Sequence, residues 1–148
     1  MTERADGGRT VITFGTFDVF HIGHLAILER AADLGSRLVV GVSSDELNIA
    51  KKGRPCVYPY VARAAIVGAL RCVDEVFSEE SLERKRDYVQ QFGADVLVMG
   101  HDWTGRFDHL QDICEVVYLP RTPSVSTTET IERIKLMPPM HIGDPGAR

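Results

Sequence analysis

The sequence predicts an α/β protein: a doubly wound, mainly parallel five-stranded sheet with helices on both faces. Short runs rich in Val, Leu and Ile alternate along the chain with longer segments of helical periodicity, which favours a parallel sheet joined by crossover helices. The strand-like runs are apolar throughout rather than at alternate positions, as expected when both faces of a sheet are covered. A length of 148 residues suits one such domain.

The first strand–helix–strand unit is indicated by the residues that end its elements. Residues 10–15, TVITFG, form a β-rich run that ends at a glycine. Residues 24–35 place leucines and alanines at helical spacing and also end at a glycine, a common helix stop. Residues 37–43, RLVVGVS, form a second buried strand, and we expect Lys51 and Lys52 to lie in the loop that follows it.

The middle of the chain repeats this alternation. Residues 60–73, YVARAAIVGALRCV, are expected to be helical, with Pro59 near the first turn. Residues 74–78, DEVFS, form a short strand. Residues 81–93 form an amphipathic helix that is capped by Ser81 and ends at a glycine.

Two strands and a helix complete the pattern, which is Rossmann-like. Residues 94–100, ADVLVMG, and 114–120, CEVVYLP, are the last strands. Residues 126–136 form the final helix, with Ser126 or Thr127 as N-cap and a glutamate positioned for a capping box.

Composition and termini limit the classes of function. We expect residues 1–148 to be a single domain with an ordered core at about 10–136 and flexible ends at 1–9 and 137–148, since the last segment holds three prolines and two glycines. A net charge of −4 argues against binding to nucleic acid or an anionic membrane, although it permits a local basic pocket.

The three cysteines, Cys56, Cys72 and Cys114, form no CxxC pair, so neither a zinc ribbon nor a redox pair is indicated. We expect reduced thiols in a cytoplasmic protein. The first ten residues lack the apolar region of a signal peptide, and no apolar run approaches the length of a membrane span.

Two histidines, His21 and His24, lie in TFDVFHIGH, where the first strand turns into a helix. Zinc binding would need further ligands, which His101, His109, Asp18 and Asp102 could supply only through space. A packing role is disfavoured by the glycine between the two histidines.

A phosphate-binding role accounts for more of the residues in this turn than zinc binding or packing does. A helix N-terminus offers free N–H groups and a positive dipole end, and glycine lets a phosphate approach the backbone. Imidazole N–H groups can stabilise charge on a phosphoryl group in a transition state. In a doubly wound sheet, ligands bind at the carboxyl ends of the strands, which also receive SSDELNIAKKGR, GHDWTGRFD and PRTPSVSTT.

Four stretches carry a family resemblance. GTFDVFHIGH resembles the HxGH signature of the nucleotidyltransferase superfamily, and RTPSVSTT resembles the RTxGISTT signature of its cytidylyltransferase branch. LRCVDEV and VMGHDWTGRFD are similar to two further stretches of that branch, and the four occur in family order over residues 11–136. Within the branch, the similarity is greatest to bacterial enzymes that use glycerol 3-phosphate.

The resemblance implies that CTP and a small phosphomonoester give a CDP-alcohol and pyrophosphate. The attacking phosphate is already anionic, so positioning and charge stabilisation would suffice without a Ser or Cys nucleophile. The implied catalytic residues are His21, His24, Lys51, Arg71 and Arg121. The implied substrate-binding residues are Gly15, Thr16, Phe17, Asp18, Lys52, Arg63, Asp74, Gly100, Asp102, Trp103, Thr122, Ser126 and Thr127.

Several assignments stay open. The spacing favours Lys51 over Lys52 as the lysine that reaches the α-phosphate, but one residue is apparently inserted before Arg63, so the choice stays open. Asp18 could form the turn or hold a histidine or the loop, and Trp103 could be a packing anchor. Arg63 and Arg71 lie eight residues apart, which would place them on one face of the helix expected over residues 60–73.

The second signature departs from the family pattern. Its usual Gly-Ile is replaced by Ser124-Val125 and preceded by Pro123, so the loop can follow a different path. The acceptor is therefore open: glycerol 3-phosphate, phosphocholine, phosphoethanolamine, or another polyol or sugar phosphate. An adenylyltransferase of the FAD synthetase type and a non-catalytic nucleotide-binding module are the alternatives.

The resemblance also implies Mg²⁺ delivered as Mg–CTP rather than held in a metal site of the protein. It implies a homodimer, for which the helix at 60–73 and the VDEV stretch could supply the interface.

Overall fold

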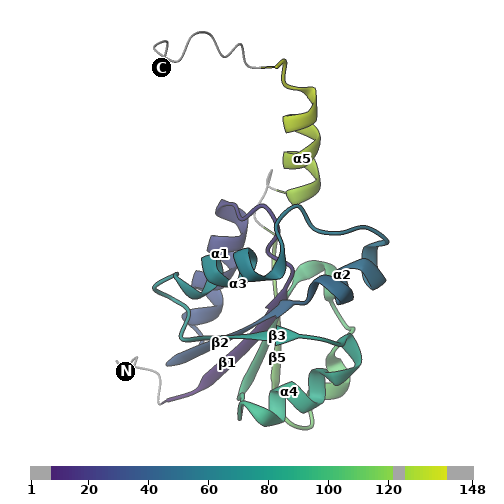
Figure 1. Ribbon diagram of the computed structural model, residues 1–148. Coiled ribbons are helices and arrows are strands. Elements are labelled where there is room, and N and C mark those ends of the chain that lie inside the picture. The colour runs from purple at the N-terminus through teal and green to yellow at the C-terminus, as the bar shows by residue number, and fades with distance from the viewer. Residues whose placement is uncertain (1–7, 122–125, 140–148) are drawn as a thin grey trace.

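The computed structural model describes residues 8–121 and 126–139. Five strands form one sheet in the order β3-β2-β1-β4-β5, and every pairing is parallel. The prediction of a doubly wound parallel sheet is thus confirmed (Figure 1). The strands are β1 Thr10–Gly15, β2 Arg37–Ser43, β3 Glu75–Glu79, β4 Val96–Gly100 and β5 Glu115–Leu119.

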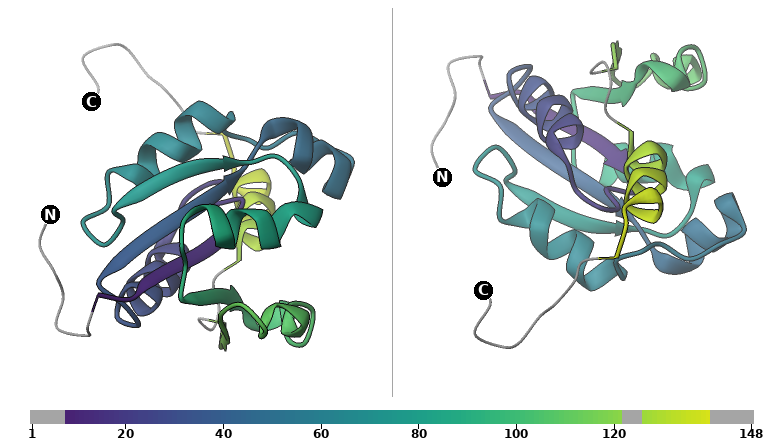
Figure 2. Two further views of the ribbon diagram at one scale, coloured as in Figure 1. Left: turned by 90° about the horizontal axis from the view of Figure 1, so that it is seen from below. Right: turned by 90° about the horizontal axis from the view of Figure 1, so that it is seen from above.

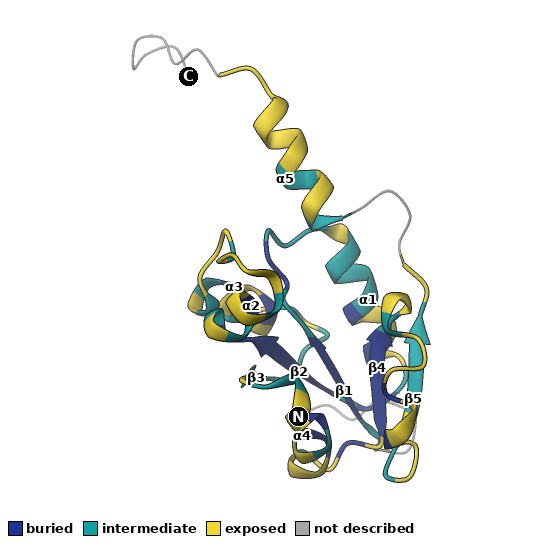
Figure 3. Ribbon diagram, turned by 90° about the vertical axis from the view of Figure 1, so that its right-hand side faces the viewer, coloured by how far each residue is buried: buried dark blue, intermediate teal, exposed yellow. Residues whose placement is uncertain are grey.

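Helices cover both faces of the sheet (Figure 2). Leu28 of α1 and Val67 of α3 pack against one face, whereas Tyr88 of α4 and Leu110 of η3 pack against the other. The central strands are the most deeply buried elements (Figure 3). The α-helices are α1 Ile22–Ala32, α2 Asp45–Lys52, α3 Tyr60–Gly68, α4 Lys85–Gln91 and α5 Thr127–Leu136, and the 3₁₀ turns are η1 Leu82–Arg84, η2 His101–Trp103 and η3 Asp108–Leu110.

Helix α2 occupies the segment after β2, so the prediction that Lys51 and Lys52 lie in a loop was wrong. Its signals are local: the Ser44 hydroxyl accepts a hydrogen bond from Leu47 N at 3.0 Å, acidic residues occupy the first turn, and lysines occupy the last turn. Gly53 ends the helix with a φ of 71°. The helix therefore carries Lys51 and Lys52 on its last turn instead of in a loop.

Helix α3 is shorter than predicted. It ends at Gly68, and Arg71 lies in the turn beyond it, so the prediction that Arg63 and Arg71 share one helical face was wrong. Helix α1 begins at Ile22 rather than at residue 24, because the side chain of His21 itself provides the N-cap.

The strand order creates a crevice. From β1 the chain runs outward to β2 and β3, then returns to the other side of β1 to form β4 and β5. Neighbouring strands that lead in opposite directions leave an opening at their carboxyl ends. Helix α5 stands above this edge and extends away from the sheet (Figures 1 and 3). None of the helices in the described ranges is long and apolar enough to cross a membrane.

Candidate active site

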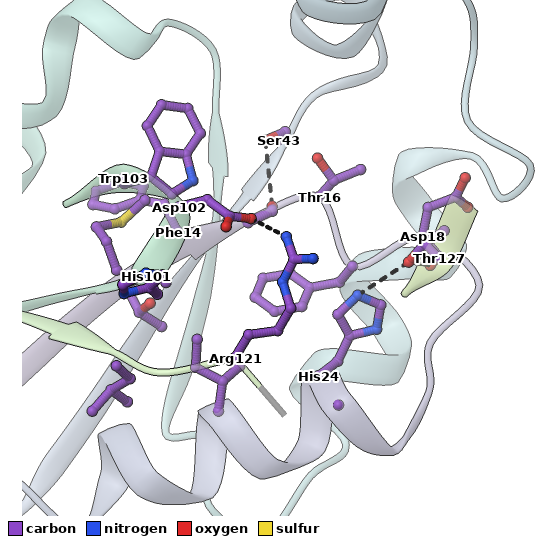
Figure 4. Close-up of a pocket in the computed structure, with 18 of the residues that line it drawn as sticks. Phe14, Thr16, Asp18, His24, Ser43, His101, Asp102, Trp103, Arg121 and Thr127 are labelled. Atoms are coloured by element: carbon purple, nitrogen blue, oxygen red, sulfur yellow. Dashed lines mark hydrogen bonds and ion pairs between the residues drawn. The ribbon is translucent and has the colours of Figure 1, made fainter. Parts of the chain in front are cut away.

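A cavity of about 810 Å³ lies at the carboxyl ends of β1 and β4 (Figure 4). It is lined by segments that follow all five strands and by the beginning of α5. Most of the residues singled out in the sequence meet there: Gly15, Thr16, Phe17, Asp18, His21, His24, Lys51, Lys52, Gly100, Asp102, Trp103, Arg121, Ser126 and Thr127.

Arg63 lies beneath the cavity rather than in its lining. Its side chain is fully buried, with Nη1 donating to the carbonyl oxygens of Thr16 at 2.9 Å and Ser43 at 2.8 Å. Its other nitrogens bind the Tyr58 carbonyl and the Asp45 carboxylate. The guanidinium therefore joins the turn after β1 to the end of β2, the start of α2 and the segment before α3.

The remaining predicted residues lie elsewhere. Arg71 lines a separate cavity of about 560 Å³ beside α1. The Asp74 carboxylate accepts a hydrogen bond from Leu38 N at 2.7 Å, near the amino end of β2 and so at the opposite edge of the sheet. Thr122 and the Pro123–Val125 departure fall outside the described residues.

The turn after β1 adopts unusual backbone angles. Phe17 has a φ of 56° and Val19 a φ of 47°, which is strained for a β-branched residue. The Phe17 ring is buried so close to Gly15 that a Cβ there would lie 2.7 Å from it. Backbone strain of this kind persists only when the surrounding structure holds it.

The side chain of Asp18 helps to stabilise this turn. Its buried carboxylate accepts hydrogen bonds from Val57 N at 2.7 Å and Tyr58 N at 2.9 Å, so it joins this turn to the segment before α3. Of the roles left open by the sequence, Asp18 therefore has the contacts of a loop-holding residue.

The backbone fixes the tautomers of both histidines. Nδ1 of His21 accepts a hydrogen bond from Gly23 N, and Nδ1 of His24 accepts one from His21 N, both at 3.1 Å. The two histidines thus form a reciprocal capping box, so each neutral ring carries its proton on Nε2. Both Nε2 atoms face the Thr127 hydroxyl, at 3.2 Å from His21 and 3.4 Å from His24.

Both imidazoles are held in the neutral form. Burial lowers the pKa of His24 to about 4, and the nearby His21 acts in the same direction. Burial also lowers the pKa of His21. The rings stack with centroids 3.8 Å apart, so the pair presents two N–H donors without a full positive charge. The described residues contain no group of three His, Cys, Asp or Glu side chains that could hold a metal ion, so the zinc hypothesis finds no third ligand among them.

Thr16 is held by a residue that the sequence analysis missed. Its hydroxyl donates to Oδ1 of Asn48 at 3.0 Å, and the Asn48 amide donates to the carbonyl of Ser44 at 3.1 Å. Asn48 is fully buried. Once α2 is recognised, an amide on its inward face is the signal that could have identified this residue.

A buried ion pair forms another wall of the cavity and was also missed. Glu79, at the end of β3, pairs with Lys85, at the start of α4. Lys85 Nζ also lies 4.1 Å from the centroid of the Phe14 ring. In the sequence, Lys85 lies in the amphipathic helix predicted over residues 81–93, and no motif singles it out.

The side chains at the mouth of the cavity are more exposed. Arg121 extends from the end of β5 and forms an ion pair with Asp102 after β4 (Figure 4). Trp103 packs against Phe107, with centroids 5.6 Å apart, so its contacts within the fold are those of a packing anchor. Ser126 is the N-cap of α5 and accepts a hydrogen bond from Glu129 N at 3.0 Å, which selects it over Thr127 for that role.

Comparison with known proteins identifies the family and several relatives of this chain. A profile described as cytidylyltransferase-like matches residues 12–133. A glycerol-3-phosphate cytidylyltransferase of Bacillus subtilis (strain 168) is 48% identical over 126 residues, which cover 85% of this chain and 97% of that protein. An FAD synthase of Pyrococcus horikoshii is 31% identical over 134 residues, which cover 84% and 90%.

The fold also has a relative among solved structures. The lipopolysaccharide core biosynthesis protein from Thermoplasma volcanium GSS1 superposes with a TM-score of 0.69 at 23% identity, covering 78% of this chain and 99% of that one. At this identity the likeness concerns the fold alone.

Proposed function

Because this chain belongs to the cytidylyltransferase-like family, we propose that it transfers the cytidylyl group of CTP to glycerol 3-phosphate, giving CDP-glycerol and pyrophosphate. The observation that carries the proposal is the convergence of the Nε2–H groups of His21 and His24 on one point in a cavity that also holds lysines and arginines. The 48% identity to a glycerol-3-phosphate cytidylyltransferase supports this choice of reaction.

In this proposal the two histidines bind the α-phosphate. Their Nε2–H groups exchange the Thr127 hydroxyl for phosphoryl oxygens and stabilise the charge that builds up in the transition state. Because the imidazoles are neutral, they donate hydrogen bonds without transferring a proton. Lys52 lies close enough for its charge to lower the pKa of His24, which supports Lys52 as the lysine on the α-phosphate side.

The leaving group is assigned to the other side of the cavity. An acceptor oxygen forms a bond to the α-phosphorus in line with the bond to the β-phosphate bridging oxygen, which breaks, and the electron pair leaves with pyrophosphate. Arg121, at the end of β5, lines that side, and its guanidinium suits the growing charge.

The acceptor phosphate is assigned to Lys51 and Lys85. Both line the cavity, on the side away from Arg121 where β2 and β3 end. A phosphomonoester has a second pKa of about 6 and is mainly a dianion at neutral pH, so its oxygen attacks without a general base. Two lysines can hold it near the α-phosphate.

Mg²⁺ enters this scheme bound to CTP. The charged side chains in the cavity are mostly lysines and arginines, and the described residues offer no cluster of three acidic, His or Cys ligands. This donor set fits a metal carried by substrate phosphates rather than a cage of protein ligands. Calorimetric titrations with CTP in the presence and absence of Mg²⁺, and with Mg²⁺ alone, test this assignment. Mg²⁺ alone should not bind measurably.

A pyrophosphate-release screen tests the reaction. Four nucleoside triphosphates are crossed with glycerol 3-phosphate, phosphocholine, phosphoethanolamine, a polyol phosphate, a sugar phosphate and FMN. We expect the highest kcat/KM with CTP and glycerol 3-phosphate, and CDP-glycerol as the product. Turnover of ATP with FMN would favour the activity named for the FAD synthase relative, whereas binding of CTP without turnover would favour a nucleotide-binding module.

Two further properties belong to the proposal. A homodimer is supported by α3, which exposes 76% of Val61 and 37% of Ile66. Light scattering during gel filtration tests it, with Val61→Lys as the variant expected to dissociate the dimer. A cytoplasmic location is supported by the thiols of Cys56 and Cys114, which form no disulfide within the described residues. Fractionation of cells that express the tagged chain tests that location.

A further inference from the structure

The ion pair between Glu79 and Lys85 is more deeply buried than fold stability explains. Glu79 is 1% exposed and Lys85 is 3% exposed, yet both side chains border the cavity. Burying two charges costs about as much as their attraction returns, and an apolar pair is often equally stable. A pair retained at the wall of a substrate cavity therefore points to a task in that cavity.

A third residue extends the pair to a second lysine. Lys51 Nζ donates to Ser43 Oγ at 3.1 Å, and that hydroxyl lies 3.2 Å from Oε1 of Glu79. The other carboxylate oxygen binds Lys85. The Ser43 proton has two acceptors within reach, Glu79 Oε1 and the Gly15 carbonyl at 3.3 Å. One carboxylate thus holds two ammonium groups, one from α2 and one from α4, at the same wall of the cavity.

The charges of this cluster match a phosphomonoester. Burial lowers the pKa of Lys85 and of Lys51, and the Glu79 carboxylate opposes that shift at both. Two ammonium groups and one carboxylate leave a net charge of +1, which a phosphate dianion can approach. Without Glu79, two partly buried like charges would face each other, and the loss of a proton from one of them would relieve the repulsion.

We infer that Glu79 and Ser43 are positioning residues, which keep Lys51 and Lys85 oriented and charged to receive the phosphate of the acceptor. This inference rests on the proposed function, because it assigns that phosphate to the two lysines. Neither Glu79 nor Ser43 needs to contact the reacting atoms, since each acts through a lysine.

Three variants test the inference. Glu79→Gln removes the charge, and Ser43→Ala removes only the link to Lys51. Glu75→Gln is the matched control, because Glu75 opens the same strand, pairs with Arg37 and lies outside the cavity. The measurements are KM for glycerol 3-phosphate, KM for CTP and, by calorimetry, the affinity for CTP.

We expect Glu79→Gln to raise KM for glycerol 3-phosphate roughly tenfold or more, the cost of one charge-assisted contact, while the affinity for CTP stays within about twofold. Ser43→Ala should raise the same KM by a smaller factor, and Glu75→Gln should leave it unchanged. Equal losses for both substrates would show that Glu79 serves the fold, and an unchanged KM for glycerol 3-phosphate would also overturn the inference.

Lysine titration followed by ¹³Cε NMR gives a readout that does not need turnover. The titratable groups that act on the two lysines are Glu79, Lys52 and Cys56, together with the lysines themselves. We expect the pKa of Lys85 to fall further in Glu79→Gln. An unchanged titration refutes the positioning role by itself, whereas a wild-type protein that is inactive with glycerol 3-phosphate refutes the proposed function and the acceptor role of the lysines.

Discussion

Replacing His24 by asparagine tests whether this imidazole is neutral in the folded protein. Nδ1 of His24 accepts the backbone N–H of His21, and the side-chain oxygen of asparagine can accept the same hydrogen bond. Asparagine does not titrate, so the variant keeps the acceptor of the capping box and removes the proton equilibrium.

The size of the effect follows from the pKa. His24 has a pKa of about 4 in the fold, against 6.5 for the free side chain, and burial is the main cause. Because the unfolded chain binds the proton more tightly, the neutral ring contributes its full stability above pH 6.5. That contribution is lost as the pH falls from 6.5 towards 4. At pH 5 the loss amounts to about 2 kcal/mol.

Urea unfolding at pH 7.5 and pH 5 measures the difference. The wild type should lose about 2 kcal/mol more than His24→Asn between the two pH values. His109→Asn is the control, since His109 is exposed on η3 and lies outside the cavity. Equal losses in the wild type and in His24→Asn would mean that His24 is charged or freely titrating, and the assignment of a neutral donor would be refuted.

Four further predictions concern activity and stability. His21→Ala should keep the fold and lower kcat by roughly 10²–10³, the usual cost of one donor to transition-state charge; unfolding with release of zinc would instead favour a metal site. Arg121→Lys should lower kcat and raise KM for CTP but barely affect CMP binding, because a single ammonium cannot replace the two parallel hydrogen bonds that a planar guanidinium makes to the pyrophosphate. Equal losses of affinity for CMP and CTP would mean that Arg121 supports the loop or contacts the base instead. Arg63→Met should reduce the free energy of unfolding by about 3–5 kcal/mol, measured in urea, because buried carbonyls lose their donor; a change under about 1 kcal/mol would contradict its structural role. Removal of the residues after Leu136, which is 83% exposed, should change neither kcat nor Tm, and a fall of several degrees in Tm would show that they dock.

The sequence predicted the fold well because its strands are strongly marked. Four of the five strands are mainly apolar runs, β3 (EVFSE) being the exception, and the structure pairs all five in one parallel sheet. Helix boundaries were less well predicted. Helix α2 is only eight residues long and mostly polar, so its capping residue and end charges are its main local signals. Helix α3 continues in the sequence pattern through residue 73 but ends at Gly68 in the structure.

The site residues that were predicted correctly from the sequence are those that lie in sequence motifs. The histidines and Arg121 follow strand ends, and the topology brings those ends together. Arg63 shows the limit of such reasoning, because an arginine at a motif position reads as a phosphate ligand until its buried contacts are known. Glu79 and Lys85 lie six residues apart across a turn, and no sequence period indicates that they pair.

An acidic protein can bind a polyanion because the carboxylates of its cavity are already engaged. Asp18 accepts backbone N–H groups, Glu79 holds Lys85 and Ser43, and Asp102 pairs with Arg121. The first two carboxylates are buried and fixed, whereas both partners of the last pair are more than half exposed. An exposed ion pair contributes only about 0–1 kcal/mol, so a triphosphate can take Arg121 from Asp102 at little cost. The buried pair resists such an exchange, so the wall with Lys85 stays in place while the mouth of the cavity adjusts to its nucleotide.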